Sequence, residues 1–127
     1  MNEYITGMHH IAIICSDREE SLKFYSALGF TVAENHVRPQ SHDEIIWMSG
    51  YGITLELFID ATHPARVTNP EAYGLRHLAL CTTDIEAAVQ FLKQSGYQPE
   101  PIRADSFTGE KMTFVKDPDG LPIELHE

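Results

Sequence analysis

The chain contains the same short pattern twice. Residues 7–17 read GMHHIAIICSD and residues 74–84 read GLRHLALCTTD, so the second copy follows the first at an offset of 67. The offset continues to align identical residues well beyond these stretches, in the pairs His10/His77, Ala12/Ala79, Asp17/Asp84, Glu19/Glu86, Phe24/Phe91 and Gly29/Gly96. A match of this extent indicates a duplicated module, and a duplicated module restricts the fold more than any compositional property does.

The local patterns within each copy predict one strand, one helix and three further strands. Short aliphatic runs at 8–15 and 75–82 are typical of strands. Each run is followed by an Asp suited to cap a helix and then by a Gly suited to end it, namely Asp17 with Gly29 and Asp84 with Gly96. The extended segments that follow are 30–38, 44–49 and 53–59 in the first copy, and 97–104, 111–116 and 121–126 in the second. We therefore expect an α+β fold of two tandem βαβββ modules, whose mixed sheet curls around a cavity.

The length of 127 residues is that of one domain. Within a single domain 1–127 we expect a first module at 7–59, a linker at 60–73 and a second module at 74–127. The linker is indicated by its two prolines. A module of about half the chain buries too little surface to be stable on its own, so we expect the two modules to pack together.

Composition excludes several classes of function. The formal net charge is −10, which disfavours partners such as nucleic acids and anionic membrane surfaces. No apolar run approaches the ~18 residues of a membrane span. The first six residues lack the basic and apolar regions of a signal peptide, so we expect none. Two cysteines, Cys15 and Cys81, are too few for a disulfide scaffold, which suggests a reducing compartment and a cytoplasmic location. Both are expected to be small core thiols.

Two histidines and two glutamates occupy matched positions in the modules. His10 and His77 lie on the first strand of each module, and Glu56 and Glu124 interrupt its apolar last strand, 46 and 47 residues later. Strand alternation places all four on the face away from the helix. Burying two carboxylates without positive charge is strongly unfavourable, whereas a divalent ion with two neutral imidazoles gives a neutral cluster. The pattern predicts a site for Ni, Co, Zn, Fe or Mn.

Each of the four residues has a simpler interpretation when it is taken alone. A single strand histidine is more often structural than metal-binding, and a single glutamate in an amphipathic strand usually faces water. The duplication of both favours the metal interpretation. We expect His9 to face the helix side, and we expect the histidines without a duplicate to lie on the surface or at a pocket rim: His36, His42, His63 and His126.

The segments HHIAIICSD, TLELF, GLRHLAL and DPDGLPIELHE resemble the glyoxalase/bleomycin-resistance/extradiol-dioxygenase group, the vicinal oxygen chelate (VOC) superfamily. The resemblance covers essentially the whole chain and implies that His10, Glu56, His77 and Glu124 are the metal ligands. A complete His-Glu-His-Glu set is similar to that of bacterial glyoxalase I. The dioxygenase and fosfomycin-resistance branches usually have three protein ligands, and bleomycin-binding members have none.

The resemblance implies a metal-dependent lyase or isomerase of the glyoxalase I type. Such an enzyme moves a proton through a metal-stabilised enediolate of a small substrate with two vicinal oxygens, and either Glu56 or Glu124 could be the base. A homodimer is also implied. Two alternatives remain open: a resistance-type protein that binds or sequesters a small molecule without turnover, and, more weakly, an extradiol-type dioxygenase.

One departure from glyoxalase I concerns the thiol. That enzyme binds the glutathione tail with an Arg four residues after the first ligand and an Asn four residues after the second. Here these positions hold Ile14 and Asp60, which puts glutathione use in doubt. Another acidic substrate could instead be bound by basic residues of the second half, namely Arg66, Arg76, Arg103 and Lys111.

Overall fold

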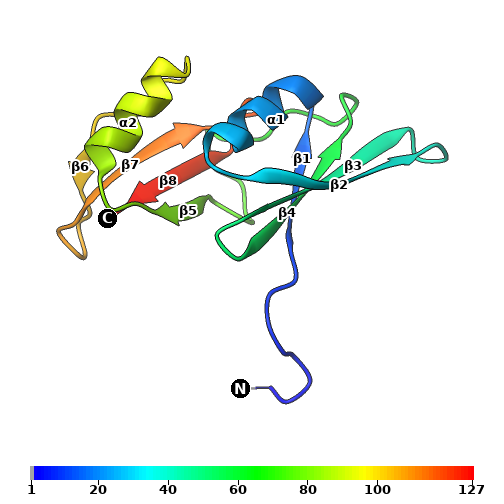
Figure 1. The fold of residues 1–127 in the computed structure, drawn as a ribbon, viewed down its shortest axis with the longest axis horizontal. Helices are drawn as coiled ribbons and strands as arrows, with labels where there is room; N and C mark the ends of the chain where they lie inside the picture. Colours follow the sequence, from blue (N-terminus) through cyan, green and yellow to red (C-terminus); the bar gives the residue numbers. More distant parts are fainter. Residues whose placement is uncertain (1) are drawn as a thin grey trace. The chain divides into compact units, whose positions relative to one another are not determined.

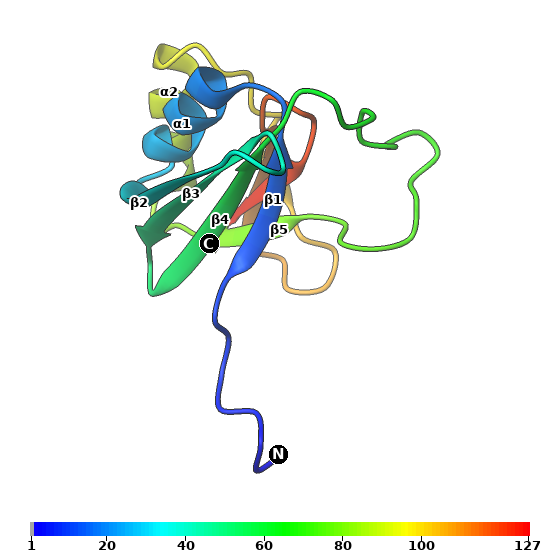
Figure 2. The ribbon, with the colours of Figure 1, turned by 90° about the vertical axis from the view of Figure 1, so that its right-hand side faces the viewer.

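A computed structural model describes residues 2–127. The chain divides into two compact units, Met1–His63 and Pro64–Glu127. Each unit has one helix and one four-stranded mixed sheet, in the order βαβββ (Figures 1 and 2). The predicted α+β fold with two tandem βαβββ modules is confirmed.

The first unit is built on the sheet order β1-β4-β3-β2. Its elements are β1 (Ile11–Cys15), α1 (Arg18–Ala27), β2 (Thr31–Arg38), β3 (Asp43–Gly50) and β4 (Ile53–Ile59). β1 runs parallel to β4, and the other neighbours are antiparallel. Alternate side chains of the central strands are buried together with the inner face of α1, and this core includes Ile13, Phe24, Tyr25, Ile46, Met48, Leu55 and Leu57.

The second unit repeats this topology in the sheet order β5-β8-β7-β6. Its elements are β5 (Leu78–Cys81), α2 (Ile85–Gln94), β6 (Arg103–Ala104), β7 (Lys111–Lys116) and β8 (Pro122–His126). β5 is parallel to β8, as β1 is to β4. Helix α2 lies over one face of this sheet (Figure 1). Its core includes Ile85, Val89, Leu92, Val115, Ile123 and Leu125, so the opposite face is left for other side chains.

The two helices begin and end where the sequence predicts. The side chain of Asp17 accepts a 2.9 Å hydrogen bond from the backbone N–H of Glu20, and Asp84 accepts one of the same length from Ala87. Such caps contribute about 1 kcal/mol each. Gly29 and Gly96 follow the helices with φ of 100° and 92°, a conformation that side-chain-bearing residues rarely adopt.

Three expectations about the strands and core are wrong. The segment 97–104 contributes only the two-residue β6, because Pro99 and Pro101 have no N–H to donate to a ladder. The first strands of the modules begin at Ile11 and Leu78, later than predicted. Cys81 is exposed, whereas Cys15 is buried, because Cys81 alternates onto the face opposite the helix.

No helix among residues 2–127 is both long and apolar enough to span a membrane.

Candidate metal centre

The first unit brings His10 and Glu56 together. Ala12 of β1 pairs with Glu56 of β4, and His10, two residues before Ala12, lies on the same face. The His10 Nε2 is 3.5 Å from the Glu56 Oε1, and the glutamate side chain is only 13% exposed. Trp47 of β3 is the cross-strand partner of Glu56, and its indole Nε1–H donates a 2.6 Å hydrogen bond to Glu56 Oε2. The Trp47 ring also stacks on His10, with centroids 6.3 Å apart.

The second unit brings His77 and Glu124 together in the same way. Ala79 of β5 pairs with Glu124 of β8, and His77 Nε2 lies 3.0 Å from Glu124 Oε2. Phe114 of β7 is the cross-strand partner of Glu124 and contacts His77 edge-on, with ring centroids 5.1 Å apart. Glu124 is 8% exposed, so a carboxylate is buried in the middle of β8.

Each half-site therefore has an aromatic residue that the sequence reasoning missed. Trp47 and Phe114 are separated by 67 residues, the offset of the duplication, and this was the signal that could have found them. The two differ in one respect. Trp47 holds Glu56 by an N–H donor, whereas the phenyl ring of Phe114 offers no donor to Glu124.

The residue before each candidate histidine contacts that histidine's Nδ1. His9 Nδ1 is 2.7 Å from His10 Nδ1, and Arg76 Nη1 is 3.2 Å from His77 Nδ1. The prediction that His9 faces the helix is wrong: it is exposed, and its ring centroid is 6.0 Å from that of Trp47. With Nδ1 engaged in both modules, Nε2 is the nitrogen turned toward the carboxylate. Histidine ligands usually donate the Nδ1–H to an acceptor, a role that the His9 ring nitrogen can fill for His10 but that the Arg76 guanidinium, which only donates, cannot fill for His77.

A further His/carboxylate group in the second unit shares Glu124. One ligand atom each of Asp105, Glu124 and His126 lie within 4.8 Å of one another. Asp105 is already engaged: its Oδ1 accepts from the N–H groups of Phe107 and Thr108, and its Oδ2 is 3.1 Å from His126 Nε2. These contacts lower the pKa of Asp105, with the two backbone hydrogen bonds as the largest cause. These hydrogen bonds give Asp105 a structural role in the turn that follows it, and this role explains its position without a metal ion.

The other unduplicated histidines are exposed, as predicted. His36 lies 2.8 Å from Glu34, His63 lies 3.6 Å from Asp60, and His42 is in a turn with φ of 55°.

The two positions that replace the glutathione-binding residues carry no cation. Ile14 is 56% exposed on β1. Asp60 accepts hydrogen bonds of 2.8 and 2.6 Å from the N–H and hydroxyl of Thr62, and these hydrogen bonds lower the pKa of Asp60.

The donor set fits a divalent ion. Each unit presents one imidazole nitrogen and one largely buried carboxylate on the sheet face away from its helix. Neutral imidazole and carboxylate are ligands that Zn, Ni, Co, Fe and Mn accept, so the donors of each half-site suit such an ion.

Comparisons with known proteins establish the family. The model of the Glyoxalase/Bleomycin resistance protein/Dioxygenase superfamily matches residues 7–125. The chain belongs to this superfamily. It is 46% identical to the uncharacterised protein YwkD of Bacillus subtilis, over 97% of this chain and 98% of that protein. It is 42% identical to the uncharacterised protein YaeR of Escherichia coli, over 94% and 95%. The crystal structure of a glyoxalase family protein from Enterococcus faecalis superposes with a TM-score of 0.92 at 45% identity, over 98% and 99% of the two chains.

More distant superfamily members have named activities. A "Probable lactoylglutathione lyase" of Vibrio cholerae is 28% identical over 91% of this chain and 86% of its own. A fosfomycin resistance protein, FosX of Listeria monocytogenes, was crystallised with Mn(II) and a dihydroxypropylphosphonic acid. FosX has a TM-score of 0.75 over 96% of this chain and 92% of its own, and at 17% identity it shares the fold alone. The V. cholerae relative is thus named as a probable lyase, and the FosX structure contains Mn(II).

Proposed function

We propose that the protein binds one divalent metal ion through His10, Glu56, His77 and Glu124. We propose further that it is a glyoxalase-like lyase or isomerase that moves a proton on a small substrate with two vicinal oxygens. The observation that carries the proposal is the matched pair of half-sites, each with a histidine Nε2 turned to a largely buried carboxylate. The probable lyase from V. cholerae supports the reaction class.

The buried carboxylates favour a metal over a purely structural role. Glu124 is 8% exposed and has no Lys or Arg within 4.0 Å among residues 2–127. A largely buried carboxylate that has histidines but no Lys or Arg beside it is costly unless a cation compensates its charge. A bound divalent ion compensates both carboxylates and supplies Lewis acidity toward the substrate oxygens.

The two glutamates have different freedom to take part in proton transfer. Trp47 donates to one oxygen of Glu56 and restrains that side chain. Glu124 lies beside Phe114, which has no donor, so its second oxygen is not held by an aromatic partner. In the proposed mechanism Glu56 is a restrained ligand and takes no proton. Glu124 takes the proton from one substrate carbon and returns it to the neighbouring carbon.

Glutathione is not the favoured thiol for this enzyme. Ile14 cannot form the ion pair that a guanidinium would form with a glutathione carboxylate, and Asp60 adds repulsion. Loss of one charge-assisted contact costs about 1.5–3 kcal/mol, or roughly one to two orders of magnitude in specificity. We expect glutathione hemithioacetals to be poor substrates.

Steady-state turnover of methylglyoxal with glutathione, after separate reconstitution with Ni, Co and Zn, tests this point. A kcat/KM near ~10⁷ M⁻¹s⁻¹ with any one metal would show ordinary glyoxalase I activity and contradict the expected specificity. Proton transfer is tested by exchange of substrate carbon-bound hydrogen in D₂O, with small 2-oxoaldehyde adducts and 2-hydroxyketones as substrates. Exchange that is retained in Glu124→Gln would contradict the role of Glu124. Tight substrate binding without any exchange would favour the alternative of a sequestering protein.

A further inference from the structure

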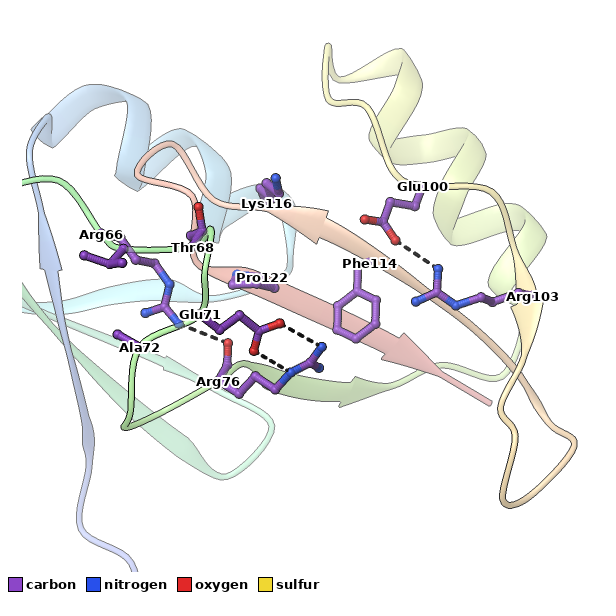
Figure 3. Close-up of a pocket in the computed structure, with 11 residues that line it drawn as sticks. Arg66, Thr68, Glu71, Ala72, Arg76, Glu100, Arg103, Phe114, Lys116 and Pro122 are labelled. Carbon is purple, nitrogen blue, oxygen red and sulfur yellow. Dashed lines mark hydrogen bonds and ion pairs between the residues drawn. The ribbon is translucent and has the colours of Figure 1, made fainter.

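The second unit contains a basic cavity that the metal ligands do not account for. It has a volume of about 230 Å³ and lies between the segment after Pro64 and the ends of β7 and β8 (Figure 3). It is smaller than the roughly 300–1,000 Å³ of sites for drug-sized ligands, so its size suits a small metabolite. Its lining residues with charged or aromatic side chains are Arg66, Glu71, Arg76, Glu100, Arg103, Phe114 and Lys116.

The charge of this cavity is opposite to that of the chain. Four cationic side chains and two carboxylates line it, which leaves a formal surplus of two positive charges, whereas the whole protein carries −10. Lys111, which the sequence suggested as a candidate, is not part of the lining and pairs instead with Glu86 at 2.5 Å. Lys116 takes its place, and Lys116 has no carboxylate within 4.0 Å among residues 2–127. A local concentration of positive charge on an acidic protein attracts anions to this cavity.

The cationic groups are positioned by contacts that a ligand can replace. Arg76 pairs with Glu71 at 2.9 Å and Arg103 pairs with Glu100 at 3.1 Å, and both pairs are exposed to solvent. Exposed ion pairs stabilise little, so an anion can compete with these glutamates. Arg103 also lies over the Phe114 ring, with its guanidinium carbon 5.5 Å from the centroid, and Figure 3 shows Arg76 on the other side of that ring.

The cavity adjoins the second half of the metal centre. Arg76 Nη1 is 3.2 Å from His77 Nδ1, and Phe114 contacts the His77 ring. Two residues that line the cavity, Arg76 and Phe114, therefore also contact the histidine of this half-site.

We propose that this cavity binds an anionic group of the substrate, a carboxylate or a phosphate, through Arg76, Arg103 and Lys116. The inference rests on the proposed function only in naming the bound anion as part of the substrate. It defines the substrate class as small acids in which an anionic group lies beside the vicinal oxygens. Arg66, whose Nη2 donates to the carbonyls of Leu75 and Arg76 at 2.8 and 3.1 Å, fixes the wall of the cavity.

Amide chemical-shift titrations of the full-length protein with inorganic phosphate and with succinate test the proposal directly. We expect saturable amide shifts at Thr68, Arg76, Phe114 and Lys116 with at least one of these anions. The anion that binds more tightly shows whether the cavity prefers a phosphate or a carboxylate. Lys116→Gln should weaken the affinity by roughly three- to tenfold, as expected for one partly screened charge. The double variant Arg103→Gln/Lys116→Gln should abolish it. Lys93→Gln, an exposed lysine of α2 outside the cavity, is the matched control and should bind as the unmodified protein does.

The outcomes separate this inference from the proposed function. His77→Ala should lose the metal ion and keep the anion-dependent shifts, whereas Lys116→Gln should keep the ion and lose affinity for the anion. Absence of saturable shifts with both anions overturns the inference, as does equal affinity in the Lys116→Gln and Lys93→Gln variants. Neither result affects the metal proposal. Anion binding in a protein that holds no metal would overturn the proposed function alone.

Discussion

The hydrogen bond between Trp47 and Glu56 gives a sharp test of the first half-site. The indole Nε1 lies 2.6 Å from the Glu56 Oε2, and the glutamate side chain is 13% exposed. Hydrogen bonds to charged groups contribute about 1.5–3 kcal/mol to stability, and partial exposure favours the lower end, about 1.5 kcal/mol. Trp47→Phe installs the residue that the second module has at the matched position and removes only the donor and the pyrrole ring. At roughly 4 °C per kcal/mol for a chain of this size, we expect the Tm to fall by about 6 °C.

The single variant also loses packing, so a double-mutant cycle is needed. Thermal unfolding followed by circular dichroism, with EDTA present, is compared for Trp47→Phe, Glu56→Leu and the double variant. The packing terms cancel in the cycle, and the remaining coupling between Trp47 and Glu56 should be about 1–2 kcal/mol. A coupling below about 0.5 kcal/mol would show that the indole does not restrain Glu56. The assignment of different roles to Glu56 and Glu124 would then lose its basis.

Two further predictions concern pH and assembly. The Arg38 guanidinium donates hydrogen bonds to Asp43 and lowers the pKa of that carboxyl. The contribution of this pair to stability is therefore present above pH 3.8 and is lost as the pH falls through the lower folded-state pKa of Asp43. We expect the urea midpoints of Asp43→Asn and of the unmodified protein, measured between pH 2 and 6, to differ near pH 6 and to converge at the acid end. We also propose a homodimer, because related two-module proteins often complete their metal cavity across a subunit interface, and sedimentation that shows only monomer at micromolar concentration with the ion still bound would exclude it.

The parts of the structure that depend on local sequence could be predicted. The helix caps at Asp17 and Asp84 and the module order follow from residue type, periodicity and the internal repeat. The prediction of an extended strand over 97–104 was wrong because Pro99 and Pro101 have no N–H to donate to a ladder. Local patterns are reliable here only when backbone hydrogen bonding is counted as well.

The features that depend on cross-strand register could not be predicted as well. Trp47 lies beside Glu56 because β3 and β4 pair in one register, and a strand-by-strand interpretation does not give that register. Lys116 rather than Lys111 lines the basic cavity for a similar reason: Lys116 is paired with Pro122 on β8, while Lys111 lies at the other end of β7. The offset of 67 contained part of this information, since it relates Trp47 to Phe114.

The metal content of purified protein tests the central claim most directly. Inductively coupled plasma mass spectrometry of the unmodified protein and of His10→Ala, His77→Ala and Glu124→Ala, each dialysed after loading with the same divalent ion, gives the number of ions per chain. We predict one ion per chain in the unmodified protein, loss of the tightly held ion in all three variants, and retention in the control Asp105→Asn, whose carboxylate is engaged in its own turn. One tightly held ion retained in both His77→Ala and Glu124→Ala would contradict the four-residue site.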